Sequence, residues 1–151
     1  MKIRIFTLIT LLSFVSILQA QKSVLTAEKL WKLGRVSDVK VSPDGSKVLY
    51  GVTRYDLEKN SGDRDLYVLD RAAESPRQLT DFKGSEYNGI WRPDGKKIGF
   101  IATKDGTSQI WEMNPDGTEK EKISDIEGGV TGFSYAPTIN RILYTKNVKL
   151  D

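Results

Sequence analysis

Residues 88–124 read NGIWRPDGKKIGFIATKDGTSQIWEMNPDGTEKEKIS. This stretch contains four short apolar runs, and the tripeptide Pro-Asp-Gly occurs in it twice, at 93–95 and 115–117. In such a turn proline presets φ, aspartate hydrogen-bonds its own backbone, and glycine adopts the positive φ that other residues resist. The apolar runs are therefore predicted to be strands, and each Pro-Asp-Gly is predicted to close a hairpin.

The same unit recurs along the chain in a fixed register. The first run of each copy ends at Val41, Trp91 and Tyr135, the second begins at Val48, Ile98 and Ile142, and the fourth is marked by Leu79 and Ile123. Pro43 and Pro93 stand 50 residues apart, whereas Pro93 and Pro137 stand 44 apart, so the first copy is 6 residues longer. The sequence is thus a tandem repeat with one insertion.

A four-stranded unit of roughly 40 to 50 residues that cannot cover both of its own faces is typical of a β-propeller blade. The predicted fold is all-β, with antiparallel blades at about 36–80 and 87–124 and the first hairpin of a third at 130–151. The chain has no histidine, which argues against the WD-repeat subtype with its Gly-His signature. Closed propellers have roughly four to eight blades. We therefore expect the front portion of a longer protein, and a self-assembling small propeller is the alternative.

Two places depart from the regular unit. The extra residues of the first blade fall in a charged segment between Arg54 and Arg64, which is predicted to be a loop. This loop is either a tolerated solvated insertion, which we favour, or a place where function has been added. In the third copy Pro-Thr-Ile-Asn replaces Pro-Asp-Gly. Ile139 should resist positive φ, so Asn140 is predicted to take the left-handed conformation instead.

The amino terminus is predicted to be a secretory signal peptide covering residues 1–20. Lys2 and Arg4 precede an apolar and hydroxyl run over 5–18, and Ala20 stands before a polar stretch. A membrane anchor is the alternative, but the run is shorter than the roughly 20 residues of a spanning helix. We expect an exported, periplasmic or extracellular protein without a stable membrane anchor.

A short helix is expected within residues 21–35. Thr26 is a suitable N-cap, Glu28 complements the helix dipole, and Gly34 is a natural stop. Leu30 and Trp31 share a face at helical spacing, so the helix is predicted to dock as a brace on the propeller.

Charge and composition exclude several functions. The chain has 23 basic and 20 acidic residues, and two of the basic ones fall within residues 1–20. Acidic and basic residues alternate, so no basic patch for nucleic acid is expected. The absence of cysteine excludes disulfides, a thiol nucleophile and a thiolate metal site.

The sequence gives little support for a catalytic or metal site. Ser134 lies in Gly-Phe-Ser-Tyr-Ala, one residue short of a nucleophile elbow, but the expected context is a strand and the chain offers no histidine base. Asp63 and Asp65 could flank a cation. The repeating aromatic residues are assigned to the core or to packing between blades: Tyr50, Trp91, Phe100, Trp111, Phe133 and Tyr144. No catalytic, cofactor-binding or metal-ligating residue is assigned, and no cofactor is expected.

The motifs resemble a known family. VSPDGSKVLY at 41–50 and QIWEMNPDGTEKEKIS at 109–124 are similar to the TolB-like propeller repeat. The run from Leu25 to Pro43, with IEGGVTGFSY at 126–135, more narrowly resembles the start of secreted prolyl-oligopeptidase-family serine peptidases of the dipeptidyl-peptidase V type.

This resemblance implies that a later α/β-hydrolase domain supplies Ser, Asp and His, and that the propeller admits short peptides to it. The partners implied are peptide substrates and that missing domain, and a homodimer of the complete protein stays open. The alternative is a TolB-like periplasmic propeller that binds a protein and has no enzymatic activity.

Overall fold

The computed structural model describes residues 24–73, 75–104 and 106–149. The chain divides into two compact units, Met1–Leu30 and Trp31–Asp151. All the described strands belong to the second unit, and they form antiparallel sheets in which each strand pairs with the next one along the chain. The predicted signal peptide lies outside the described residues.

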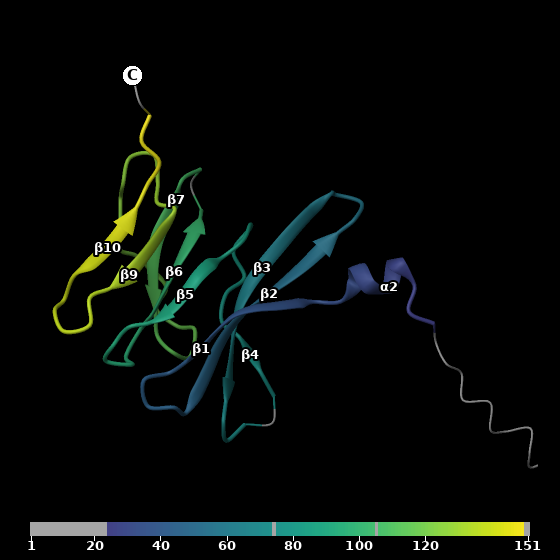
Figure 1. The fold of residues 1–151 in the computed structure, drawn as a ribbon, viewed down its shortest axis with the longest axis horizontal. Coiled ribbons are helices and arrows are strands. Elements are labelled where there is room, and N and C mark those ends of the chain that lie inside the picture. The colour runs from purple at the N-terminus through teal and green to yellow at the C-terminus, as the bar shows by residue number, and fades with distance from the viewer. Residues whose placement is uncertain (1–23, 74, 105, 150–151) are drawn as a thin grey trace, which may run out of the picture. The chain divides into compact units, whose positions relative to one another are not determined.

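The two complete sheets contain four strands each (Figure 1). The first sheet is β1 (Arg35–Val41), β2 (Lys47–Asp56), β3 (Ser61–Asp70) and β4 (Arg77–Gln78). The second is β5 (Tyr87–Trp91), β6 (Ile98–Thr103), β7 (Ser108–Met113) and β8 (Glu121–Lys122). A hairpin of β9 (Gly132–Tyr135) and β10 (Ile142–Thr145) follows. The prediction of two four-stranded blades and the first hairpin of a third is confirmed.

The predicted register is also confirmed. In all three sheets the residue predicted to begin the second apolar run pairs with the residue predicted to end the first: Val48 with Val41, Ile98 with Trp91, and Ile142 with Tyr135. Equivalent residues of the three copies therefore occupy equivalent places on their sheets.

The three Pro-Asp-Gly turns have the predicted geometry. Gly45, Gly95 and Gly117 have φ values of +72°, +70° and +85°. In each turn the aspartate Oδ1 accepts a hydrogen bond from the backbone N–H two residues later, at 3.0–3.1 Å. The Ser42 hydroxyl and then the Ser46 contacts hold the pKa of Asp44 down at about 2. The Arg92 side chain lowers the pKa of Asp94, and the Thr118 hydroxyl lowers the pKa of Asp116. The turn chemistry thus accounts for all three carboxylates.

The turn of the third sheet differs from the prediction. Asn140 does not have a positive φ, so the left-handed assignment is wrong. The backbone N–H of Arg141 instead donates to the carbonyl of Ile139 at 2.8 Å, which tightens the chain over three residues without a left-handed position. Ala136 N–H still donates to the carbonyl of Arg141 at 2.9 Å, and this bond preserves the register of Ile142.

The predicted charged loop between Arg54 and Arg64 is wrong as well. The insertion lengthens a hairpin, because β2 and β3 each have 10 residues whereas β6 and β7 each have 6. Residues 57–60 alone form the turn, where Asp56 Oδ1 accepts two backbone N–H groups and Asn60 has φ of +48°. Charged side chains fit this strand extension because exposed faces accept them, while the added backbone groups pair with each other.

The fourth strands are shorter than expected. Leu79 and Ile123 lie just after β4 and β8, although their N–H groups still donate to Leu66 and Ile110 at 2.8 and 2.9 Å. The next residue ends the ladder with a side chain. The hydroxyl of Thr80 accepts the N–H of Leu66 at 2.8 Å, and Ser124 does the same for Ile110. In the sequence this end of the ladder is marked by an apolar residue followed by a hydroxyl residue, at Leu79-Thr80 and at Ile123-Ser124.

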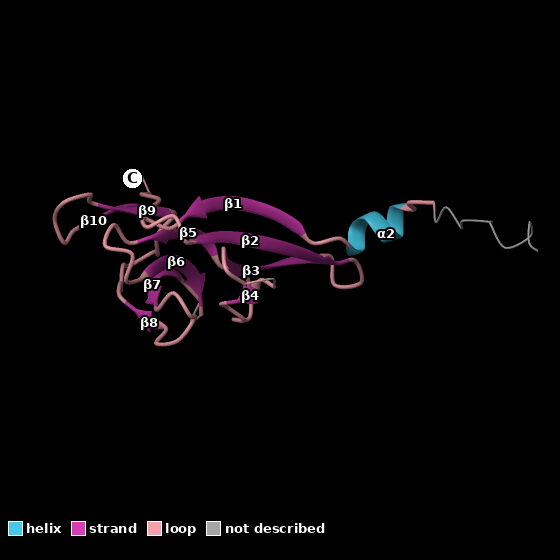
Figure 2. Ribbon diagram, turned by 90° about the horizontal axis from the view of Figure 1, so that it is seen from below, coloured by secondary structure: helices cyan, strands magenta, loops and turns pink. Residues whose placement is uncertain are grey.

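Two apolar clusters hold the sheets together, and Figure 2 shows the strands of these sheets as ribbons. The first joins the first and second sheets and contains Leu49, Leu66, Val68, Leu79, Ile98, Phe100, Ala102, Trp111 and Met113. The second joins the second and third sheets and contains Ile101, Ile110, Val130 and Phe133. The middle strand β6 is therefore buried on both faces, as the prediction of stacked blades requires.

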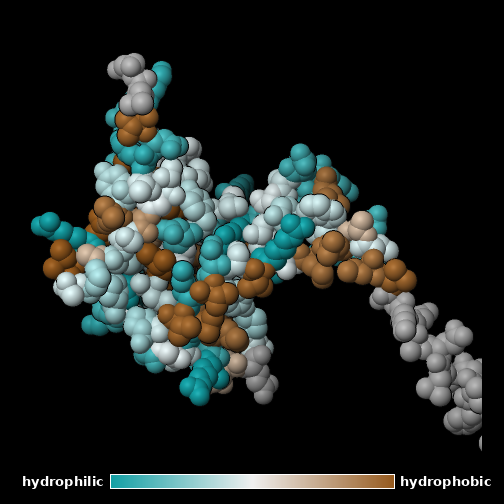
Figure 3. Space-filling view, in the orientation of Figure 1, coloured by the Kyte–Doolittle hydropathy of each residue, from teal (hydrophilic) through white to brown (hydrophobic). Residues whose placement is uncertain are grey.

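Apolar residues on the outer faces of the first and third sheets are exposed. Val39 and Val41 are 56% and 61% exposed, and Figure 3 shows apolar residues at the surface over β1. Tyr144, which was assigned to packing, is 44% exposed. The other repeating aromatics, Tyr50, Trp91, Phe100, Trp111 and Phe133, are buried or half-buried, as predicted.

The predicted helix is present as α2 (Ala27–Lys32). The Lys29 N–H donates to the hydroxyl of Thr26 at 3.3 Å, which confirms the N-cap. Gly34 does not adopt the left-handed conformation of a C-cap. A Cβ at this position would lie 2.7 Å from the Val52 side chain, so close approach explains the glycine. No residue of α2 is buried, and docking as a brace stays a prediction.

Replacing Ile101 by alanine should destabilise the chain by about 3 kcal/mol, because the side chain is fully buried between the second and third sheets. The matched control is Ile139→Ala, which truncates an isoleucine that is 58% exposed and should change stability by less than about 0.5 kcal/mol. Urea unfolding followed by tryptophan fluorescence measures both. Equal effects of the two substitutions would contradict the stacked arrangement.

Candidate functional site

Ser134 lies inside β9, where it pairs with Leu143 of β10 and its side chain is exposed. The predicted strand context is confirmed. A hairpin follows this strand, whereas a nucleophile elbow requires a helix after the serine.

The second predicted pair, Asp63 and Asp65, lies on β3 opposite Arg54 and Val52. The pKa of Asp65 is raised, first by burial and then by the charge of Asp63. Among the described residues no group of three or more Asp or Glu side chains has an arrangement that could hold a metal ion. The pair nevertheless belongs to a larger acidic group that the sequence analysis missed.

The centre of that group is Glu86, which is only 1% exposed. Oε2 of its carboxyl has no hydrogen-bond partner among the described residues. Burial raises the pKa of Glu86 to about 7, and the charges of Asp65, Asp63 and Asp81 add to this effect. A buried carboxyl with a strongly raised pKa is a candidate functional group.

One backbone hydrogen bond and one aromatic contact fix the segment around Glu86 at the junction of two sheets. It ends the first connector, residues 79–86 between β4 and β5, and its N–H donates to the carbonyl of Arg64 on β3 at 2.8 Å. Phe82 of the same connector packs against Trp111 of the second sheet, with ring centroids 5.2 Å apart. The connector therefore contacts both blades.

The second connector, residues 123–131 between β8 and β9, shows the neutral version of this junction. Val130 occupies the place of Glu86, and its N–H donates to Ser108 at 2.8 Å. Gln109 occupies the place of Asp65, and its Oε1 accepts the Ser124 hydroxyl and the Ile126 N–H at 2.7 and 3.0 Å. When the two copies are aligned with an offset of 44 residues, Glu86 falls opposite the apolar residue Val130. This mismatch in the sequence could have indicated that Glu86 is unusual.

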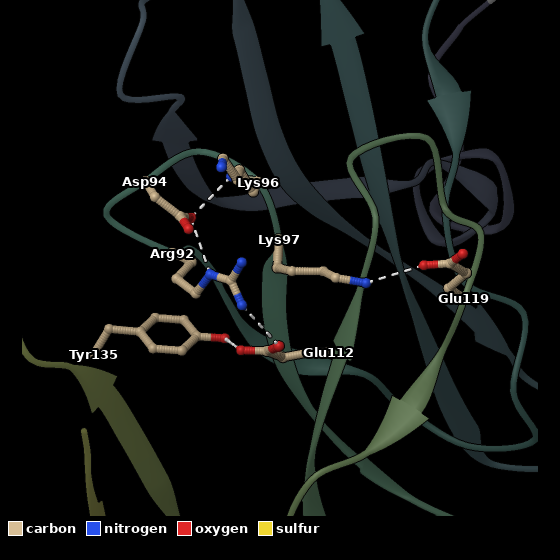
Figure 4. A network of polar contacts seen from close by, with 7 residues as sticks. All are labelled: Arg92, Asp94, Lys96, Lys97, Glu112, Glu119 and Tyr135. Atoms are coloured by element: carbon tan, nitrogen blue, oxygen red, sulfur yellow. Dashed lines mark hydrogen bonds and ion pairs between the residues drawn. The ribbon is translucent and has the colours of Figure 1, made fainter. Parts of the chain in front are cut away.

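A second polar feature lies between the second and third sheets (Figure 4). Tyr135 on β9 donates its hydroxyl to Oε1 of Glu112 on β7 at 2.7 Å, and Arg92 Nη1 donates to Oε2 at 3.3 Å. Arg92 Nε also donates to Asp94 at 2.9 Å. Burial and the bond to Glu112 raise the pKa of Tyr135. This network joins β9, β7 and the turn after β5, and it involves no nucleophile with an adjacent base.

The equivalent junction between the first two sheets is apolar. Val68 stands in place of Glu112 and belongs to the first cluster, while Trp91 stands in place of Tyr135 and donates to the Lys40 carbonyl at 3.2 Å. Beside the polar network a hollow of about 490 Å³ opens between the turns after β5 and β9. Arg141 at its rim aligns with Lys47 and Lys97, which pair with acidic residues of their own sheets.

Comparisons with known proteins agree with this architecture. A family model of the TolB beta propeller domain matches residues 18–150. Dipeptidyl-peptidase 5 of Porphyromonas gingivalis is 40% identical over 125 residues, which cover 83% of this chain and 18% of that protein. The chain therefore spans less than a fifth of the length of this curated relative.

Two solved structures share the fold. The acylaminoacyl peptidase of Pyrococcus horikoshii superposes with a TM-score of 0.59 at 21% identity, covering 72% of this chain and 16% of that one. A putative TolB from Agrobacterium tumefaciens gives a TM-score of 0.57 at 24% identity, covering 72% of this chain and 38% of that one.

The helix α2 has six residues, and no helix in the described part of the chain is long and apolar enough to cross a membrane.

Replacing Tyr135 by phenylalanine should destabilise the chain by about 1–2 kcal/mol, because the half-buried Glu112 carboxylate loses its hydroxyl donor. Tyr144→Phe is the matched control, since Tyr144 lies on the same sheet and is 44% exposed. Thermal or urea unfolding compares the two variants. If both lost the same stability, the network would not contribute to holding the third sheet.

Proposed function

Because this chain belongs to the TolB beta propeller domain family, we propose that it is the amino-terminal propeller portion of an exported serine exopeptidase. The observation that carries this proposal is the 40% identity with a dipeptidyl-peptidase over 83% of the chain. In this role the blades supply a wall beside a catalytic domain, and the chain itself performs no bond cleavage.

The chemistry of the chain fits a non-catalytic role. A serine nucleophile of the triad type needs a histidine base within hydrogen-bond reach, and the sequence contains no histidine. A separate α/β-hydrolase domain would therefore supply the triad, and the propeller would limit access to short peptides. The basic, apolar and small-residue pattern of residues 1–20 supports export.

A second function is a binding propeller without an attached enzyme. The likeness to the TolB structure supports it, because that protein shares the fold of this chain. In that case the propeller presents a face to a protein partner. The two functions share a fold and differ in what is joined to it.

Reading the coding sequence beyond Asp151 distinguishes them. The exopeptidase predicts a Gly-x-Ser-x-Gly segment several hundred residues downstream, followed by Asp and then His. A coding sequence that ends after six or seven blades without this segment would rule the exopeptidase out and support the binding propeller.

The activity makes a second test. The protein expressed from the complete gene should release dipeptides from a chromogenic dipeptidyl substrate, and replacement of the elbow serine should abolish this release. Residues 21–151 alone should show no turnover above a vector control. Turnover by residues 21–151 would contradict the non-catalytic role assigned to this portion.

A further inference from the structure

Glu86 is unusual among the acidic residues of the chain because its environment suits a neutral carboxyl better than a carboxylate. Glu86 is only 1% exposed, and its Oε2 lacks a hydrogen-bond partner among the described residues. A buried charge without a partner costs several kcal/mol, whereas a protonated carboxyl costs much less. The closed connector therefore selects the protonated form.

The neighbouring charges reinforce this selection. Asp63 and Asp65 of β3 and Asp81 of the first connector all act on Glu86 with the same sign, while Arg54 of β2 lies beside Asp65. Ionised Glu86 would be the fourth carboxylate of this group. Like charges this close disfavour the ionised form, and moving apart relieves the repulsion.

Residues 83–86 of the connector have few bonds that oppose such a movement. The Glu86 N–H bond to Arg64 and the Thr80 hydroxyl that caps the Leu66 N–H, both at 2.8 Å, join it to β3. Gly84, with φ of +109°, lies in its middle and has no atom within 4 Å of a Cβ position, so the chain can bend there. At its start the connector is held by the Leu79 N–H bond to Leu66, by the burial of Leu79 in the first cluster and by the packing of Phe82 on Trp111.

We propose that Glu86 is a proton-operated latch on the first connector: protonated Glu86 keeps the connector closed over the junction of the first two blades, and ionised Glu86 opens it. The second connector is a built-in control, because Val130 and Gln109 replace Glu86 and Asp65 there. The latch is independent of any catalytic domain.

The pH range of the latch follows from the raised pKa. In the open connector the Glu86 carboxyl returns toward its ordinary pKa of 4.5, whereas in the closed connector its pKa is about 7. The closed form is therefore favoured fully below about pH 4.5, and its advantage falls as the pH rises to about 7. Opening should be greatest at and above pH 8.

Hydrogen–deuterium exchange of the protein between pH 5 and pH 8.5, corrected for intrinsic rates, tests this proposal. Peptides containing the Leu66 and Glu86 amides should lose protection by more than roughly tenfold between pH 5 and pH 7, with little further loss above pH 7. Peptides containing the Ile110 and Val130 amides should not. Glu86→Gln, which mimics the protonated carboxyl, should keep the first connector protected throughout, and Glu127→Gln, at an exposed site, should behave like the parent.

Asp63→Asn provides a second variant that leaves Glu86 in place. Removing this neighbouring charge should move the loss of protection to lower pH, because Glu86 then ionises more easily. The latch is refuted if the two connectors respond to pH alike, if Glu86→Gln keeps the pH response of the parent, or if Asp63→Asn leaves its midpoint unchanged.

Discussion

The structure depends on covering both faces of the second sheet. Backbone hydrogen bonds join the four strands β5, β6, β7 and β8 in that order. These bonds do not remove Phe100 on one face of the sheet, or Ile101 on the other, from water. Only neighbouring sheets can do this, and they must approach closely. Gly89 and Gly99 permit the approach, since a Cβ at either position would crowd side chains of the adjacent sheet. Repetition in the sequence is thus a consequence of repeated contact.

A constant backbone register allows the contacts between sheets to vary in chemistry. At one level the first junction has Val68 and Trp91, while the second has Glu112 and Tyr135 joined by a hydrogen bond. At another level the first junction holds buried Glu86 and the second holds Val130. Turns and ladders are the same in both cases, so the scaffold accepts an apolar, a hydrogen-bonded or an ionisable pair without a change of fold. Such positions are where related propellers can diverge in function.

The proposed function and the proposed latch use different properties of the molecule. A wall beside a catalytic domain requires rigid blades, which the two apolar clusters provide. The first connector is the exception, because burial there raises the pKa of the Glu86 carboxyl to about 7. Rigid blades with one adjustable joint would let proton concentration change the shape of a propeller whose core is unaffected.

The sequence by itself determined the strand count, the register and the Pro-Asp-Gly turns, because these follow from local periodicity and from the φ preferences of proline and glycine. It misled at the charged segment from Arg54 to Arg64, where backbone pairing across a hairpin outweighs composition, and at Asn140, where a contact between backbone groups replaced a left-handed residue. Glu86 could have been noticed against Val130 in the aligned repeats. That its carboxyl is buried, lacks a partner and lies among Asp63, Asp65 and Asp81 is decided only by the tertiary structure, because residues from β3 and the connector meet there after the sheets have packed.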